Sequence, residues 1–149
     1  MQLVKVGNQF YQECKARGLD KELLFNKNGR PCVLILKLKY KGQNRKFVVP
    51  FRSNIASNIP KEQYFPLPPN PATKPGNRHG IHYIKLFPIN SRYIQKYRIE
   101  DNAYMQQMKS ILDKNEKSII TACPNYLFEC EAGRKNPMTP DIDGILSWL

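Results

Sequence analysis

The chain has 149 residues, of which 41% are hydrophobic and 24% charged, and its net charge is +12. This length and hydrophobic content are typical of one folded domain, so we expect a single domain over residues 1–149 rather than a disordered segment. No apolar run is long enough to span a membrane, and the first ten residues (MQLVKVGNQF) do not resemble a signal peptide, so we expect a cytoplasmic protein.

The positive charge is concentrated in the first two thirds of the sequence. Residues 1–99 hold 19 Lys and Arg against 4 Asp and Glu, a balance of +15, whereas residues 100–149 hold 5 against 8. Such an uneven excess indicates a surface that binds a polyanion such as a nucleic acid. An anionic membrane is the alternative partner, but the basic amphipathic helix expected for it is not evident.

The amino-terminal segment predicts a strand followed by a short helix. Residues 1–6 (MQLVKV) alternate enough for a strand, and Asn8 can cap a helix that carries Tyr11. Asn, Gly and Pro are frequent in residues 26–31 (NKNGRP), which predicts a loop.

A β-hairpin follows this loop. Residues 32–40 (CVLILKLKY) begin as a continuous apolar run and end in an alternation that places Lys37 and Lys39 on one face. Residues 41–45 (KGQNR) predict a turn, and residues 46–51 (KFVVPF) predict the return strand.

The end of the return strand carries two polar residues side by side. Pro50 lacks the N–H that a ladder needs, so we expect regular pairing to end there. Arg52 and Ser53 would then stand at the rim of the sheet, facing a cleft.

Residues 54–79 differ from their surroundings because they hold six of the twelve prolines. We expect a long ordered loop or a set of short turns there. A second extended run follows at residues 80–89 (GIHYIKLFPI). Together with the hairpin it predicts an α+β fold: a small twisted antiparallel sheet or half-open barrel covered by helices.

The clearest helix prediction covers residues 100–123, where apolar side chains recur at spacings of three and four. Pro124 is expected to stop this helix, and residues 123–128 (CPNYLF) could begin a short last one. Three apolar residues of the tail are expected to dock on the body: Ile145, Leu146 and Trp148.

The cysteines do not suggest a metal site. Cys14, Cys32, Cys123 and Cys130 lack the paired C-x-x-C spacing of zinc and redox sites, so we expect buried thiols, with no cofactor and no metal. Most of the 12 acidic residues lie in the helical half. A two-metal nuclease would have few ligands to use.

If the protein cuts a nucleic acid without a metal, RNA is the natural substrate. The RNA 2′-hydroxyl is an internal nucleophile beside the phosphorus, so a protein need only orient it, move a proton and stabilise negative charge. Arg52 and Arg30 suit the last task because a guanidinium forks onto phosphate oxygens. Ser53 could position the 2′-hydroxyl or a non-bridging oxygen. A solvated arginine and a turn-forming serine are the alternatives.

Other residues could assist. Tyr11 could stack on a base or help to move a proton, and general acid–base chemistry would prefer one of the only two histidines, His79 and His82. The RNA-contact candidates are Lys37, Lys39, Lys41, Arg45, Lys46, Asn54, Lys74, Arg78, His79 and Lys85. Lysines that stay in solvent without touching RNA are the alternative for these positions.

Taken in order, these segments resemble a known family. The first strand and helix with Tyr11, then GRPCVLIL, KFVVPFRSN, GIHYIKLFPI and the long helix, are similar to the toxins of type III toxin–antitoxin systems. These are the ToxN-like, AbiQ-like and CptN-like endoribonucleases of bacterial phage defence. The resemblance covers nearly the whole chain and depends on the order of the elements.

The resemblance implies a barrel-like fold related to the MazF and Kid ribonucleases. It implies metal-independent, sequence-selective cleavage of cellular or phage RNA that leaves a 2′,3′-cyclic phosphate and a 5′-hydroxyl. It also implies inhibition by a small antitoxin RNA of tandem repeats that fold as pseudoknots. It further implies that the toxin processes the precursor of this RNA and stays bound to the product in a closed protein–RNA ring.

The family's catalytic serine lies in a Pro-x-Thr-Ser-x-Lys run, which matches PFRSNI in this chain. Ser53 matches the serine, whereas Arg52 stands where the family has threonine and Ile55 where it has lysine. Arg30 corresponds to a family lysine before the second strand, and Tyr11 to the tyrosine of the first helix.

Three other functions stay open. One is a MazF-like ribonuclease with a protein antitoxin, although those chains are usually shorter and lack the long loop and the extra helix. Another is a non-catalytic RNA-binding module, since interleaved basic and aromatic residues bind RNA without chemistry. The third is a DNA-binding protein, for which no helix-turn-helix pattern is present.

Overall fold

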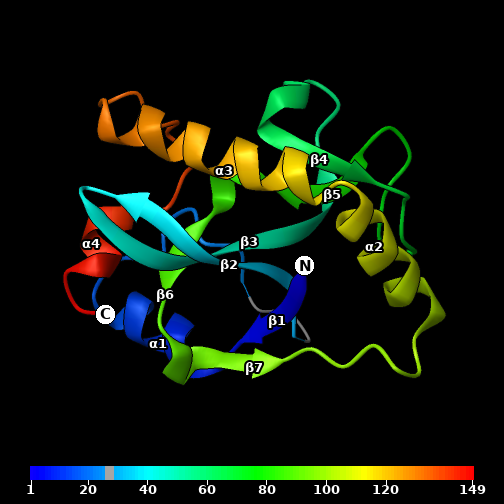
Figure 1. The fold of residues 1–149 in the computed structure, drawn as a ribbon, viewed down its shortest axis with the longest axis horizontal. Coiled ribbons are helices and arrows are strands. Elements are labelled where there is room, and N and C mark those ends of the chain that lie inside the picture. Colours follow the sequence, from blue (N-terminus) through cyan, green and yellow to red (C-terminus); the bar gives the residue numbers. More distant parts are fainter. Residues whose placement is uncertain (26–28) are drawn as a thin grey trace.

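The computed structural model describes residues 1–25 and 29–149, and it shows an α+β fold with one antiparallel sheet (Figure 1). The strands are β1 (Gln2–Val6), β2 (Cys32–Tyr40), β3 (Gln43–Ile55), β4 (Tyr64–Leu67), β5 (Arg78–His82), β6 (Phe87–Ile89) and β7 (Ile94–Lys96). The helices are α1 (Asn8–Ala16), α2 (Ala103–Lys114), α3 (Glu116–Glu131) and α4 (Ile142–Leu146), with short 3₁₀ turns at Lys61–Gln63, Tyr83–Lys85 and Ser91–Tyr93.

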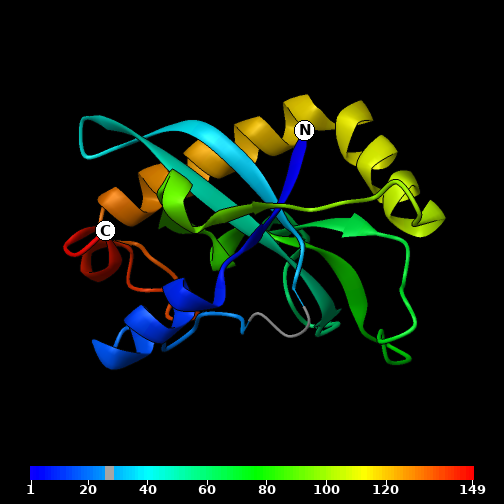
Figure 2. The same ribbon diagram turned by 90° about the horizontal axis from the view of Figure 1, so that it is seen from below.

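The described strands form an open path in the order β4-β5-β3-β2-β1-β7, and β6 pairs with β3 beside β5. The sheet is strongly twisted, with α3 and α2 across one face and α1 and α4 against the other (Figures 1 and 2). The predicted twisted sheet covered by helices is therefore confirmed, as an open sheet. Among the described residues, no helix is both long and apolar enough to cross a bilayer.

The first predicted elements are present. β1 covers residues 2–6, and α1 carries Tyr11 as expected, but the helix N-cap is Gly7 and Asn8 is its first residue. The N–H of Gly7 donates to the carbonyl of Tyr93 across 2.8 Å, which fixes where the chain enters the helix. The loop predicted at 26–31 starts in residues 26–28, which lie outside the described residues.

The β2–β3 hairpin has a tighter turn than predicted. Only Lys41 and Gly42 connect the strands, with φ of 48° and 81°, the pair of positive angles that suits a two-residue hairpin turn. A bulge after Ile35 shifts the register, and beyond it Leu38 and Tyr40 are buried. Lys37 and Lys39 are exposed, as expected.

The prediction that regular pairing ends at Pro50 is correct for the pairing with β2 but wrong for the strand as a whole. Pro50 still pairs with Cys32, and β3 continues to Ile55, but the strand changes partner at this point. From Phe51 onward it pairs with β5, starting at Ile81. A missing N–H is tolerated because Pro50 is the last residue of β3 paired with β2.

Two further predictions about extended segments need correction. The proline-rich segment contains β4, which tolerates Pro66 because it is the edge strand of the sheet. The run at 80–89 is two strands, β5 and β6, separated by the 3₁₀ turn at Tyr83–Lys85. Gly80 is required here because a Cβ at this position would lie 2.2 Å from the carbonyl oxygen of Phe65 on β4.

The predicted long helix is two helices. Asn115 separates α2 from α3, and its Nδ2 donates to the carbonyl of Ile111 across 2.8 Å. Pro124 does not stop α3, which continues to Glu131. Burial of Cys123 and Leu127 on either side of the proline offsets the lost backbone hydrogen bond.

The two faces of the sheet bury separate hydrophobic clusters, one under α2 and α3 and the other beside α1 and α4. The predicted docking of the tail is confirmed, because Ile145 is fully buried and Trp148 packs on Phe10 with ring centroids 5.7 Å apart. All four cysteines are free thiols, and three are buried as predicted: Cys14, Cys32 and Cys123.

Candidate active site

A cavity of about 700 Å³ opens where β3 changes partner. It brings together Arg30, Arg52, Ser53, Asn54 and His79, which sequence analysis had selected from three separate segments. The other lining residues are Leu24, Pro31, Phe51, Asn70, Pro71, Ala72, Tyr97, Asn102, Tyr104 and Met105. None of these described lining residues is acidic, so the cavity suits an anion.

A β-bulge explains why two consecutive residues of β3 reach the same cavity. Arg52 pairs with Gly80 and Ile55 pairs with Arg78, so β3 has one more residue than β5 over this interval. Such a bulge bends the strand and changes the direction of its side chains. Ser53 lies in the bulge, next to Arg52, and both line the cavity.

Backbone carbonyls orient Arg30. Its Nε donates to the carbonyl of Phe25 across 3.0 Å, and its Nη1 donates to the carbonyl of Phe51 across 2.7 Å. Burial lowers the pKa of Arg30, and burial together with the nearby Arg30 charge lowers the pKa of Arg52. These two guanidinium groups therefore share one partly buried, electropositive site that an anionic ligand would stabilise.

His82 holds Arg52 in place. Nη1 of Arg52 lies 3.2 Å from Nδ1 of His82, and because a guanidinium only donates, Nδ1 must accept. Burial and the charges of Arg52 and Lys85 lower the pKa of His82 to about 3. His82 is thus neutral at physiological pH and acts as a fixed acceptor behind the guanidinium.

Beneath this pair lies an ion pair. Nζ of Lys85 is 2.8 Å from Oε2 of Glu22 and also donates to the Glu22 carbonyl across 3.1 Å. Lys85 is 4% exposed. Sequence analysis placed Lys85 among the RNA contacts, but a buried lysine that is already paired does not present its charge to a surface ligand.

Ser53 is held by a loop that lies far away in the sequence. Nδ2 of Asn70 donates to Oγ of Ser53 across 2.9 Å. The Asn70 side chain is itself fixed, because its Oδ1 accepts from the N–H of Ala72 at 2.8 Å and from the Thr73 hydroxyl at 3.2 Å. The serine hydroxyl accepts this bond, so its proton is available to donate to a ligand in the cavity.

Asn54 fastens the same loop to the strand. Its Nδ2 donates to the carbonyl of Ala72, and its Oδ1 accepts from the N–H of Lys74 and from Nδ2 of Asn77. Asn54 was a candidate RNA contact, but these bonds occupy both ends of its amide. The structure therefore gives it the role of positioning the loop.

His79 borders the same cavity from β5. Its Nδ1 is 2.7 Å from the carbonyl oxygen of Pro68 and 3.0 Å from the hydroxyl of Tyr104, which also donates to that carbonyl across 2.8 Å. His79 is 3% exposed, so it is a wall of the cavity rather than a surface residue.

Tyr11 is not one of the residues that line the cavity. Its ring packs edge-on against Phe10 and Phe87. Burial raises the pKa of Tyr11 far above its usual value, and the charge of Arg30 opposes this rise. Tyr11 therefore keeps its proton and contributes to the environment of Arg30.

The candidate RNA-contact residues of the β2–β3 hairpin do not line the cavity. The tip of the hairpin lies beside α4, away from β4, β5 and α2 (Figures 1 and 2). Lys41 is paired with Asp143 across 2.9 Å, Arg45 donates to Gln43, and Lys46 donates to Ser91. Lys37 and Lys39 are exposed there, as are Lys74 and Arg78 on the loop side of the cavity.

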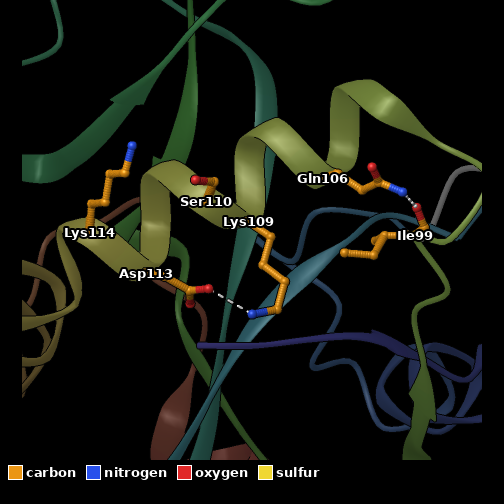
Figure 3. Close-up of a pocket in the computed structure, with 6 residues that line it drawn as sticks. All are labelled: Ile99, Gln106, Lys109, Ser110, Asp113 and Lys114. Carbon is orange, nitrogen blue, oxygen red and sulfur yellow. Dashed lines mark hydrogen bonds and ion pairs between the residues drawn. The ribbon is translucent and has the colours of Figure 1, made fainter.

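A second hollow, of about 470 Å³, lies along α2 (Figure 3). Lys109 pairs with Asp113 across 2.7 Å and Gln106 donates to the carbonyl of Ile99, so these polar groups are already engaged. None of the residues selected from the sequence lines it. The cavity at Ser53 is therefore the better candidate.

Several residues that support this site are not evident as site residues from the sequence: Asn70, Tyr104, Asn102 and Glu22. An Asn before a Pro indicates a turn at residue 70, but no local signal shows that this turn reaches Ser53. Tyr104 belongs to an apolar stripe of the predicted helix, so the sequence suggests a core residue and gives no sign that its hydroxyl contacts Pro68 and His79.

No protein-family model and no curated protein matches this sequence. Solved structures do share its fold. One chain, from work on bacterial type III toxin–antitoxin systems and selective toxin inhibition by a non-coding RNA pseudoknot, superposes with a TM-score of 0.75. It is 15% identical, and the match covers 99% of this chain and 94% of that chain.

A second chain comes from work on a bacterial antiviral system that a processed non-coding RNA regulates. It superposes with a TM-score of 0.71 at 15% identity, over 99% of this chain and 96% of that chain. The predicted resemblance to type III toxins is thus confirmed at the level of the fold, over 99% of the chain.

Proposed function

We propose that this protein is the toxin of a type III toxin–antitoxin system and that it acts as a metal-independent endoribonuclease. The observation that carries the proposal is the joint placement of Arg30, Arg52 and Ser53 in one cavity without an acidic lining residue. The fold shared with chains from work on RNA-regulated toxin and antiviral systems supports it.

The geometry suits phosphodiester transesterification. A phosphate in the cavity would meet the guanidinium groups of Arg30 and Arg52, which stabilise the charge that develops on its non-bridging oxygens. Ser53 would donate its proton to one of these oxygens or orient the 2′-hydroxyl. The 2′-oxygen attacks phosphorus and the bond to the 5′-oxygen breaks, leaving a 2′,3′-cyclic phosphate and a 5′-hydroxyl.

The proposed inhibitor is a small structured RNA made of tandem repeats that fold as pseudoknots. The toxin would cut this RNA from its precursor and remain bound to it in a closed protein–RNA ring. The net charge of +12 favours a polyanionic partner such as RNA. Cellular or phage RNA would be the substrate once the toxin is released.

The first experiment is cleavage of RNA by the purified protein in the presence of a chelator. We expect cleavage to persist and the products to carry 2′,3′-cyclic phosphate ends. A requirement for magnesium, or products with 3′-hydroxyl ends, would overturn the proposal.

Ser53→Ala tests the site itself. Loss of a donor to the developing charge should slow cleavage by about 10²- to 10³-fold and abolish growth arrest, while binding of the antitoxin RNA is kept. Ser57→Ala is a matched control because Ser57 lies in an exposed turn after β3. Equal toxicity of wild type and Ser53→Ala would show that Ser53 is not catalytic.

The main alternative is a non-catalytic RNA-binding module with the same cavity. It predicts that wild type and Ser53→Ala bind RNA equally and that neither cuts it. The DNA beside the gene distinguishes the proposed toxin from a MazF-like toxin with a protein antitoxin. Short direct repeats before a terminator indicate an RNA antitoxin, whereas a small acidic reading frame indicates a protein.

A further inference from the structure

We infer that His79 is the general base of this site, because the β3–β5 register places it opposite the bulge that carries Ser53 with its Nδ1 already fixed. This inference rests on the proposed ribonuclease function and divides the work between the two histidines. His79 accepts the proton of the RNA 2′-hydroxyl, and His82 positions Arg52.

The register brings His79 to the reacting centre. Arg52 pairs with Gly80 and Ile55 pairs with Arg78, so His79 lies directly across from the two bulge residues, Ser53 and Asn54. Both His79 and Ser53 line the 700 Å³ cavity. A phosphate held by Ser53 would thus have its ribose within the part of the cavity that His79 borders.

Hydrogen bonds select one nitrogen of His79 for chemistry. Nδ1 donates to the carbonyl of Pro68 at 2.7 Å, and the Tyr104 hydroxyl lies 3.0 Å from it. Both contacts use Nδ1, so Nε2 is the nitrogen that can accept a proton from a ligand. An imidazole oriented in this way, by an acceptor on its far side, is the usual arrangement of a catalytic base.

His82 has the opposite arrangement. Its Nδ1 accepts from Arg52 at 3.2 Å, and its Nε2 is buried with no hydrogen-bond partner in the described part of the chain. His82 is not among the residues that line the cavity. Its Nδ1 could contact a substrate only by giving up the hydrogen bond from Arg52, so His82 serves to position the Arg52 guanidinium.

The protonation state of His79 agrees with this role. Burial lowers its pKa below 6.5, and the bond to Pro68 opposes this effect only in part, so the imidazole is neutral at pH 7. The charged and titratable groups that share the cavity with it are Arg30, Arg52, Tyr97 and Tyr104. The two arginines would also favour the neutral ring.

His79 would act in the step that breaks the RNA chain. Nε2 takes the proton of the 2′-hydroxyl while the 2′-oxygen forms a bond to phosphorus. The bond from phosphorus to the 5′-oxygen breaks, and that oxygen keeps the electron pair and takes a proton from water. The imidazolium then returns its proton to water, and no oxidant, reductant or metal is needed.

The test uses two substitutions with different geometry. His79→Asn can keep a donor to the Pro68 carbonyl, because its Nδ2 lies near the position of Nδ1, but it has no basic nitrogen. We expect His79→Asn to bind RNA as wild type does and to cleave it about 10²- to 10⁴-fold more slowly. The rate of wild type should rise with pH through a limb below pH 6.5, and the variant should lack this limb.

His79→Ala completes the test by removing the whole ring. Added imidazole should restore part of its cleavage, which a purely structural histidine would not allow. Circular dichroism and thermal unfolding of both variants check the fold. If His79→Ala fails to fold, the cleavage rate and pH dependence of His79→Asn decide the test.

The outcomes separate the inference from the function. If wild type cleaves RNA without metal and His79→Asn keeps its rate and pH limb, the inference is overturned and the ribonuclease proposal stands. If wild type leaves RNA intact, the proposed function fails and the inference falls with it.

Discussion

Asn70 donates a hydrogen bond to Oγ of Ser53 across 2.9 Å, although the two residues are 17 positions apart in the sequence. This bond joins the proline-rich loop to the bulge of β3 and makes the loop part of the candidate active site. The Asn70 side chain is held in turn by Ala72 and Thr73, so its position is fixed before any ligand binds. Such fixed support is what keeps a reacting group in productive geometry.

Removing this support should impair cleavage more than binding. We expect Asn70→Ala to lower the rate of RNA cleavage by about 10- to 100-fold, because a misplaced Ser53 hydroxyl loses its alignment with phosphate. Binding of the antitoxin RNA, measured by gel shift, should change less than threefold, or about 0.6 kcal/mol. Asn58→Ala, in an exposed turn, is the control. Equal loss in both variants would show that the Asn70 bond has no role in cleavage.

The hairpin and the tail could be predicted from local patterns. The apolar run from Cys32 and the Asn- and Gly-containing segment after Tyr40 specify strand, turn and strand with short-range signals. Ile145 and Trp148 could be placed against the body because apolar residues at a chain end need a partner surface. These are the parts of the structure where local preference and tertiary packing agree.

Proline misled the prediction because its effect depends on neighbours that a sequence does not show. Pro50 lies where β3 exchanges β2 for β5, Pro66 lies in an edge strand, and Pro124 lies in a helix held by core contacts. In each case tertiary structure removes or offsets the cost of the missing N–H. Arg52 and Ser53 were selected correctly as cavity residues, but a bulge brings them there rather than a strand end.

The Glu22–Lys85 pair should be important for stability. Glu22→Gln leaves the buried ammonium of Lys85 without its counter-charge, and because Glu22 is only partly buried we expect a loss of about 1–3 kcal/mol in the free energy of unfolding. Urea denaturation measures it. Glu13→Gln is the matched control, since its pair with Arg17 is exposed and should contribute less than about 1 kcal/mol. A Glu22→Gln protein as stable as the control would contradict this role.

The neutral state of His82 predicts how stability depends on pH. Its pKa in the folded protein is about 3, whereas the unfolded chain has the ordinary value of 6.5. Between these two pH values unfolding takes up a proton, because His82 is neutral in the folded protein and charged in the unfolded chain. The free energy of unfolding is therefore unaffected by His82 above pH 6.5 and decreases as the pH falls toward 3. From pH 7 to pH 5 we expect a loss of about 1–2 kcal/mol from this residue.

His82→Asn isolates this effect. The Asn side chain can offer an oxygen to Arg52 but does not titrate, so its free energy of unfolding should vary less with pH than that of wild type. His79 is present in both proteins, and its own titration cancels in the comparison. Identical pH dependence of unfolding in the two proteins would show that His82 is not held neutral.

Lys37 and Lys39 test whether the surface outside the cavity binds RNA. Lys39 pairs with Asn44, nine residues before Ser53 on β3, and at about 3.3 Å per residue the two sites lie roughly 30 Å apart along the strand. An RNA of two or three nucleotides in the cavity cannot reach the lysines, whereas a folded pseudoknot can. The double variant Lys37→Gln, Lys39→Gln should therefore cut a short oligonucleotide at the wild-type rate.

The same double variant should bind the folded antitoxin RNA more weakly, by about tenfold at low salt. Its slope of log affinity against log salt concentration should be shallower by about 1–2, because each phosphate contact releases about 0.9 counterion. Lys114→Gln with Lys117→Gln, exposed at the junction of α2 and α3, is the charge-matched control and should keep the wild-type slope. Equal slopes in both double variants would remove Lys37 and Lys39 from the RNA-binding surface. The exposed Lys74 and Arg78 beside the cavity would then be the next residues to test.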